Sequence, residues 1–272
     1  MLPYTGLGQF VQKGEGEAPL FDSPNEMIPF QAVFSTYALA AAVSREAQVE
    51  DPIDFLSELP EMFAKAARNT KDQLAVAQLN LAFSPLKPIA DGQPLISTSH
   101  PLNPIVTPTG VVSRIGQTYS NSLGNSQPTP EALRGAELQF EQMLDDRGKK
   151  DKRTPVWVVC HPQMSQIFEE IIGTPTAPYE NTRKVNIQYN KWKVFAWRDL
   201  SSPYAWFVMG DKGKPGSDCH GLTVWFRWQQ DFDSFRDPLT KNRVIVDSFR
   251  MAQGAWTWRG ISGSAGAGAV AF

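Results

Sequence analysis

The residues best suited to chemistry in this chain are its three histidines, two of which directly follow a cysteine. The two pairs are Cys160–His161 and Cys219–His220. Cysteine and histidine bind zinc, but in zinc sites they are commonly separated by roughly two to four residues. Neighbouring residues on a strand point to opposite faces, so each pair supplies one convenient ligand. We therefore expect no metal site. Cys160 is expected to end a buried strand, and His161 to begin the turn into the next helix.

The third histidine, His100, lies in the stretch Asp91–Leu102, which reads DGQPLISTSHPL. It could act as a general base for Ser97 or Ser99. However, the stretch has no GxSxG nucleophile motif, and no third catalytic member is visible in it. The sequence therefore favours a hydrogen-bonded turn. A small hydrolase or metalloenzyme that uses His100 or the Cys-His pairs is kept as an alternative.

Motifs that bind phosphates or cofactors are also missing. The chain has no GxxxxGK(S/T) loop. Gly6-Leu7-Gly8 is not followed by the strand–helix pattern that a dinucleotide site needs. We expect no cofactor and no enzymatic turnover.

Composition sets further bounds on function. With 272 residues, of which 42% are hydrophobic and 20% charged, the chain is typical of a globular protein with one large domain or two small ones. A formal net charge of −2 argues against tight, sequence-independent binding of nucleic acid, but it allows a protein that encloses DNA. The two cysteines fit a reducing cytoplasm. No membrane-length apolar run and no signal peptide are visible. The 8 Trp and 16 Phe indicate either a large core or extensive interfaces.

The first 50 residues are expected to form an extended hairpin. Glycines and prolines interrupt this segment, and its two candidate strands are Gln9–Gln12 and Ile28–Tyr37. The charged stretch Lys13–Glu17 would form the tip. A lone hairpin is marginally stable in water, so this one is expected to need a neighbour, which could belong to another subunit.

A long helix is expected next, over residues 52–83. Asp51 suits the N-cap and Pro52 the first helical position, while Pro60 is expected to kink or restart the helix. A stripe at three- and four-residue spacing indicates one buried face. The stripe consists of Phe63, Ala66, Ala67, Thr70, Leu74, Ala77 and Leu81. Charges of both signs precede the helix and indicate either a solvated turn or ion pairs between subunits. These charges are Arg45, Glu46, Glu50 and Asp51.

The middle of the chain is expected to form a loop and then an α/β lobe. Residues 97–130 resemble a long polar loop, which a partner would order. A helix should follow, with Thr129 as its N-cap and Pro130 at its first position. The further elements expected are the strand Val156–Cys160, the helix Pro162–Ile172 with Gly173 as C-cap, and the strands Trp192–Trp197 and Tyr204–Met209.

The C-terminal part is expected to be rich in β-strands. The expected strands are Leu222–Gln230, Arg243–Ala252 and Ala255–Arg259, with turns at Asp237-Pro238 and Gly254. Residues 263–272 are mostly small and are expected to be flexible or to be fixed in place only on assembly. The chain is thus predicted to be of the α+β class.

Taken in order, these segments resemble the major capsid proteins of tailed bacteriophages, which have the Hong Kong 97-type fold. The matching stretches are GEGEAPLFDSPNEMIPF at 14–30, VSREAQVEDPIDFLSELPEMFAKAARNTKDQLAVAQLNLAF at 43–83, DGQPLISTSHPL at 91–102, TPVWVVCHPQM at 154–164, YAWFVMGD at 204–211 and SFRMAQGAWTWRGISGSAG at 248–266. A similar DG…STxHP stretch follows the long helix in one subfamily of these capsid proteins and in Mu-type head subunits. None of these motifs is catalytic, so the resemblance rests on the ordered set.

The resemblance implies an assignment of parts. The hairpin at about 4–37 is similar to the E-loop, an arm that reaches over a neighbouring subunit, and the helix at 52–83 to the spine helix of the peripheral domain. The implied division is 1–50 for the N-terminal segment and E-loop, 51–96 for the peripheral domain with the spine helix, 97–130 for the long loop, 131–212 for the α/β axial domain, 213–262 for the β-rich return of the peripheral domain, and 263–272 for the tail.

The resemblance also implies a structural function. Copies of the chain would assemble as pentamers and hexamers into a head shell around packaged double-stranded DNA. Assembly would take place in the host bacterial cytoplasm, and the protein would end in the virion capsid. Expected partners are other copies, the portal, and scaffolding or decoration proteins, with no membrane and no sequence-specific DNA contact. An encapsulin-type compartment, which shares the fold, is the alternative shell.

Residues expected at contacts between subunits are charged or aromatic. They are Lys13, Glu15, Glu17, Phe21, Phe30, Arg45, Glu46, Glu50, Asp51, Trp256, Trp258 and Arg259. The sequence departs from many relatives because almost nothing precedes the expected E-loop. A scaffold would then be a separate protein, or the N-terminal arm would be short or absent. Some members join a loop lysine to an asparagine covalently; here Lys13 and Asn242 are the one pair to nominate, without support from a motif.

Overall fold

The computed structural model shows a mixed α/β protein and describes residues 12–19, 21–22, 30–50, 55–102, 105–107, 110–112, 118–144, 150–151, 153–176, 185–211 and 221–266. The chain divides into two compact units. Unit 1 comprises Met1–Gln31, Leu79–Leu222 and Ala255–Phe272, and unit 2 comprises Ala32–Gln78 and Thr223–Gly254. Each unit is therefore built from segments that are far apart in the sequence.

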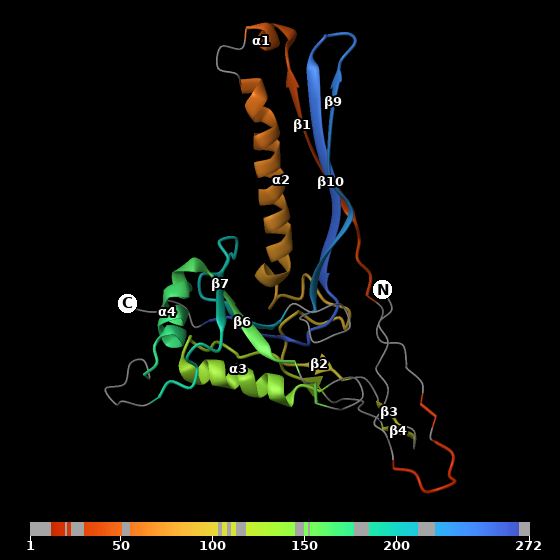
Figure 1. Cartoon of the computed structure of the whole chain (residues 1–272), viewed down its shortest axis with the longest axis vertical. Coiled ribbons are helices and arrows are strands. Elements are labelled where there is room, and N and C mark those ends of the chain that lie inside the picture. Colours follow the sequence, from red (N-terminus) through yellow and green to blue (C-terminus); the bar gives the residue numbers. More distant parts are fainter. Residues whose placement is uncertain are drawn as a thin grey trace. The chain divides into compact units, whose positions relative to one another are not determined.

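Unit 1 contains a four-stranded sheet with the order β11-β8-β6-β7. Its strands are β6 (Pro155–Cys160), β7 (Lys193–Ala196), β8 (Trp206–Gly210) and β11 (Ile261–Ser264). β6 and β7 run parallel, and the other neighbours run antiparallel. The helices α3 (Pro130–Gln142) and α4 (Pro162–Gly173) belong to the same unit (Figure 1).

The core of unit 1 lies between these two helices and one face of the sheet. Leu133 and Phe140 of α3, Phe168 of α4, Val158 of β6 and Trp206 of β8 all belong to one buried cluster. Their side chains are at most 1% exposed. Each fully buried side chain of this size contributes roughly 1.5–3 kcal/mol to folding, so this cluster contributes strongly to the stability of unit 1.

Two further pairs of short strands lie in unit 1. β2 (His100–Pro101) pairs with β5 (Thr118–Tyr119), and β3 (Ile105–Thr107) pairs with β4 (Gly110–Val112), both antiparallel. The expected loop at 97–130 is therefore not structureless.

Unit 2 consists of a three-stranded antiparallel sheet and the long helix. The sheet has the order β1-β10-β9, with β1 (Ser35–Val43), β9 (Leu222–Arg236) and β10 (Arg243–Ala255). The short helix α1 (Arg45–Val49) precedes α2 (Phe55–Asn80), which lies along the sheet (Figure 1). Two small clusters join helix to sheet: Leu59 and Phe63 with Ile245, and Ala67 with Phe249 and Met251.

Several expected elements are confirmed. Thr129 caps α3 by accepting a hydrogen bond from the Ala132 amide, and Pro130 occupies the first turn. β6 and α4 also lie within a residue of their expected bounds. The helix over residues 52–83 is present as the 26-residue α2. It contains Pro60 without a restart and ends at Asn80 rather than at Phe83. The expected cap Asp51 lies outside the described residues.

Other expectations are wrong. Residues 30–34 are not in a strand; the strand begins at Ser35 and pairs with β10 over nine residues. Gly254 does not turn the chain, because β10 continues to Ala255, and residues 256–259 form no strand. The tail does not begin at Gly263, because β11 holds this residue at the edge of the sheet.

Candidate inter-subunit surfaces

The stretch Asp91–Leu102 holds its histidine in a buried hydrogen-bonded network. The His100 ring is 0% exposed, and its Nδ1 lies 2.7 Å from Asp91 Oδ2. Its Nε2 lies 3.1 Å from Asn121 Oδ1. The sequence did not reveal Asp91 as a partner, although it lies in the same stretch, because nine residues of irregular backbone separate the two side chains.

The orientation of Asn121 fixes the role of this histidine. Asn121 Nδ2 donates to the carbonyls of Leu95 and Ile261, and Asn121 Oδ1 accepts from the amide of Ser97. The nearby His100 Nε2 must therefore donate as well, while Nδ1 meets a carboxylate. Both ring nitrogens are engaged by Asp91 and Asn121, and among the described residues no hydrogen bond joins either nitrogen to a serine hydroxyl. His100 is thus a structural residue in strand β2, not a general base and not a surface turn residue.

Two expected contact residues belong to this same buried region. The Trp258 ring stacks on His100 at 4.9 Å and on Tyr119 at 5.0 Å between ring centroids. Arg259 lies over Trp258 at 4.7 Å and donates from Nε to the carbonyl of Leu144. Trp258 and Arg259 are 3% and 6% exposed, so their side chains are used inside the subunit. Trp256, by contrast, is half-buried.

The Cys-His pair that the structure describes has no metal-binding arrangement. Cys160 is buried at the end of β6, as expected, and burial raises the pKa of its thiol to about 12, with a further contribution from Glu169. His161 begins α4, as expected, and its Nδ1 accepts from the Gln163 amide at 3.3 Å. Cys219 and His220 lie outside the described residues, within which no group of three or more potential ligands gathers.

Most of the remaining contact candidates are exposed. The turn Lys13–Glu17 is closed by a hydrogen bond from the Gly14 amide to the Glu17 carboxylate, and Lys13 Nζ donates to the Glu17 carbonyl. Glu15 lies at the exposed tip of this turn. Phe21 is 91% exposed, whereas Phe30 is half-buried.

The charges before α2 lie on α1 and its end. Ser44 caps α1 by accepting from the Ala47 amide. Arg45, Glu46 and Glu50 are exposed, and Asp51 lies outside the described residues. Arg45, Glu46 and Glu50 are therefore available for contact with other molecules.

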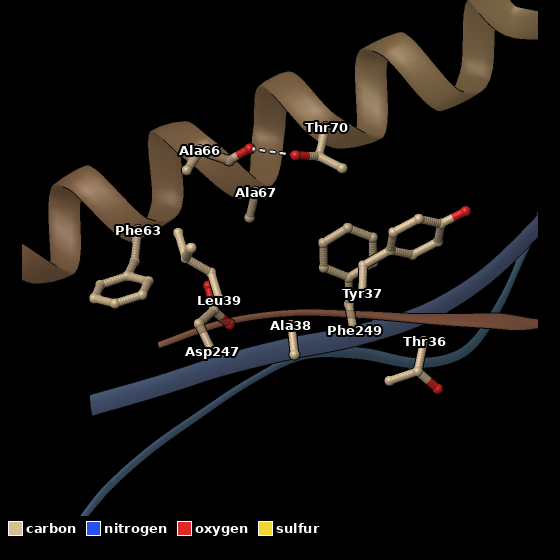
Figure 2. Close-up of a pocket in the computed structure, with 10 residues that line it drawn as sticks. All are labelled: Thr36, Tyr37, Ala38, Leu39, Phe63, Ala66, Ala67, Thr70, Asp247 and Phe249. Atoms are coloured by element: carbon tan, nitrogen blue, oxygen red, sulfur yellow. Dashed lines mark hydrogen bonds between the residues drawn. The ribbon is translucent and has the colours of Figure 1, made fainter. Parts of the chain in front are cut away.

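A groove lies between α2 and the sheet of unit 2. It has a volume of about 380 Å³, and Figure 2 shows its lining from α2, β1 and β10. Phe63 and Ala67 face it from the helix, and Leu39 and Tyr37 from β1. Asp247 of β10 is its one carboxylate.

Exposed apolar side chains gather on the same unit. On β9, Phe226, Trp228, Phe232 and Phe235 are between 39% and 52% exposed. β9 is also an edge strand of its sheet. Exposed aromatic residues beside an unpaired edge are typical of a surface that another protein chain covers.

No helix in the described part of the chain is both long and apolar enough to cross a membrane.

Several solved structures from phages share this fold. The capsid of cyanophage P-SCSP1u superimposes with a TM-score of 0.60 at 10% identity, over 98% of this chain and 83% of that chain. A chain of Microbacterium phage Oxtober96 superimposes with a TM-score of 0.52 at 9% identity, over 97% of this chain and 84% of that chain. A chain of Mycobacterium phage Patience superimposes with a TM-score of 0.52 at 12% identity, over 97% of this chain and 77% of that chain. These likenesses define the class: the fold is the Hong Kong 97-type fold of phage capsid proteins.

Sequence comparison adds the family. No curated relative matches the chain. The sequence model of the family described as phage capsid protein, however, matches residues 29–262, which is most of the chain. The chain therefore belongs to the phage capsid protein family. Its function is structural and not enzymatic: it forms the shell of the phage head and is a component of the virion.

Proposed function

We propose that copies of this chain assemble as rings of five and six subunits into a closed shell around double-stranded DNA. The match of the family model over residues 29–262 carries the proposal. Contacts that repeat head to tail close into rings when the rotation per subunit allows it. The net charge of −2 suits an inner surface that surrounds DNA without binding it tightly.

Within the subunit, α2 is proposed as the spine helix and unit 2 as the peripheral domain. Support comes from the 26-residue length of α2 and from its packing on the sheet of β1, β10 and β9. The sheet and α3–α4 layer of unit 1 is proposed as the axial domain, within residues 131–212. Strand β11 joins that sheet, so the axial domain would include residues 261–264 as well.

The E-loop is proposed to lie before Ser35. Ser35–Val43 pair with β10 in the same subunit, so these residues cannot also belong to an E-loop arm that reaches over a neighbour. The turn Lys13–Glu17 and the 91% exposed Phe21 would then contact a neighbouring copy. Portal, scaffolding and decoration proteins are the further proposed partners.

Electron microscopy of the purified protein tests the proposal directly. Closed shells are the expected result, and a protein that stays monomeric at all concentrations would contradict it. Particles from infected cells should contain nuclease-protected DNA. A shell that holds protein cargo and no DNA would instead favour the encapsulin-type alternative. On a denaturing gel, subunits that all run near 30.2 kDa would exclude a Lys13–Asn242 cross-link.

A further inference from the structure

The groove of unit 2 contains a carboxylate oxygen that has no partner in the subunit. Asp247 is 4% exposed. Its Oδ2 accepts from Gln230 Nε2 at 2.6 Å, but its Oδ1 is buried and receives no hydrogen bond from the residues that the structure describes. An unsatisfied buried charged group is costly, so such an atom calls for an explanation.

The strand pattern directs this side chain into the groove. On β10, Ile245, Asp247 and Phe249 are buried at every second position. Ile245 and Phe249 contact α2 in the two clusters that join helix to sheet. Because alternate residues on a strand share a face, Asp247 between them also faces the helix. It lines the groove there, as Figure 2 shows.

A cation on the helix of the same unit, Lys71, contacts other groups. Lys71 Nζ lies 4.8 Å from the centre of the Phe249 ring and donates to Gln230 Oε1 at 3.5 Å. The lysine thus contacts the residue that binds Asp247 Oδ2, and Oδ1 is left for a donor from outside the subunit.

The walls of the groove define the chemistry of that donor. Phe63, Ala67 and Leu39 are apolar, and Tyr37 stacks on Phe249 at 5.4 Å. A lysine or arginine side chain has an aliphatic stem that packs on apolar walls and a cationic head that reaches a carboxylate. Aromatic rings beside the carboxylate favour a cation as well.

We propose that, in the assembled head, the groove receives a lysine or arginine side chain from a second copy of this chain, whose head group donates to Asp247 Oδ1. This inference rests on the proposed self-assembly. A second copy is the natural occupant because a shell places many copies of one chain against each other. The rim supports a protein occupant: Leu39 is 53% exposed and Phe232, which contacts Phe63 edge to face, is 45% exposed.

Replacing Asp247 with Asn tests the proposal, with Asp231→Asn as control. Both variants lose one negative charge from unit 2, and Asp231 is exposed on β9. Asp247→Asn keeps an oxygen for Gln230 but presents an amide to the incoming cation. The free subunit should unfold at the same or a higher denaturant concentration, because an unpaired buried charge is removed. The concentration needed for assembly should rise about tenfold or more, since a charge-assisted hydrogen bond is lost.

Two results would overturn the inference. One is assembly of Asp247→Asn at the same concentration as the wild type and Asp231→Asn. The other is a loss of subunit stability that accounts for the assembly defect, because Asp247 would then serve the fold alone. If wild-type protein forms no shells, the proposed function fails; if wild type and Asp247→Asn form them equally, only this inference fails.

A photo-cross-link identifies the occupant. Leu39 at the rim is replaced with p-benzoylphenylalanine, and assembled particles are irradiated. A product of twice the subunit mass, joined near a lysine or arginine of the second copy, is the expected outcome. Irradiated free subunits serve as the control. A cross-link to a decoration or scaffolding protein, or no cross-link in assembled particles, would contradict the proposal.

Discussion

His100 and His161 differ in what their rings contribute to the protein. His100 is wholly buried and binds Asp91 and Asn121 through its two nitrogens. His161 uses one nitrogen to accept a backbone amide at the start of α4. Loss of a buried, charge-assisted partner leaves other polar groups unsatisfied, whereas loss of a helix cap exposes one amide to water.

The two histidines should therefore respond differently to truncation. His100→Ala is expected to lower the free energy of unfolding by about 3 kcal/mol, because Asp91 Oδ2 and Asn121 Oδ1 lose a buried hydrogen-bond partner while Asp91 Oδ1 keeps the Gln93 amide. His161→Ala should cost about 1 kcal/mol, as for other helix caps. Urea unfolding of the unassembled protein measures both, and Ser99→Ala, at an exposed position, is the control. Equal losses for the two variants would argue against the buried network.

Cys160 should have an unreactive thiol, and its contribution to folding stability should depend on pH. Burial raises its pKa to about 12 in the folded protein, above the value of 9.0 for a free thiol. The neutral thiol is favoured by folding, so its contribution to stability is complete below about pH 9 and is lost as the pH rises toward 12. In a Cys219→Ser background, iodoacetamide at pH 8 should modify Cys160 only after denaturant is added. Rapid modification of the native protein would show that the strand end is open to solvent.

At the scale of elements, small residues near the C-terminus serve close packing. A Cβ atom on Gly263 would lie 2.8 Å from Phe207 Cδ1 and 3.0 Å from Ile96 Cγ1. Ser264 Oγ donates toward the carbonyls of Gly124 and Ser126. At Gly263 and Ser264, the small residues that suggest a flexible tail thus meet the need of strand β11 for narrow side chains.

Substitutions at two glycines should have opposite effects. Gly263→Val is expected to destabilise the protein by roughly 1–3 kcal/mol, because β11 can no longer approach Phe207. Gly135 lies inside α3, and a Cβ atom added to it would have no neighbour within 4 Å beyond the helix's own backbone. Gly135→Ala should therefore stabilise by about 0.5–1 kcal/mol through helix propensity. Thermal unfolding measures both changes. A neutral Gly263→Val would indicate that β11 does not pack as described.

Local signals predicted the elements whose determinants are local. Thr129-Pro130 marks the start of α3, and Pro162 follows the cap of α4, because caps act within one turn. The bounds of β1 were predicted wrongly because its sequence, STYALAAAV, is rich in alanine, which favours helices. Its nine pairs with β10, about two hundred residues away, override that preference. The Asp91–His100–Asn121 network was missed for the same reason, since no spacing rule joins its members.

At the scale of the whole molecule, the two units differ in the size of the buried hydrophobic clusters that stabilise them. Unit 1 has a cluster of twelve buried residues, whereas the clusters that join α2 to its sheet hold three buried residues each. More than half of the large, exposed hydrophobic residues of the described chain belong to unit 2, the smaller unit. A sheet with a small core and an exposed aromatic edge gains much of its stability from a covering partner.

Hydrogen–deuterium exchange should show this difference between free and assembled protein. Amides of β9 and β10 are expected to exchange faster in the free subunit than in the shell, because β9 is an edge with Phe226 and Phe235 exposed. Amides of β6 and β8 in unit 1 should be protected in both forms, which provides a control within the same sample. If β9 and β10 are equally protected before and after assembly, unit 2 does not depend on its neighbours, and the proposed contact surface must be sought on unit 1.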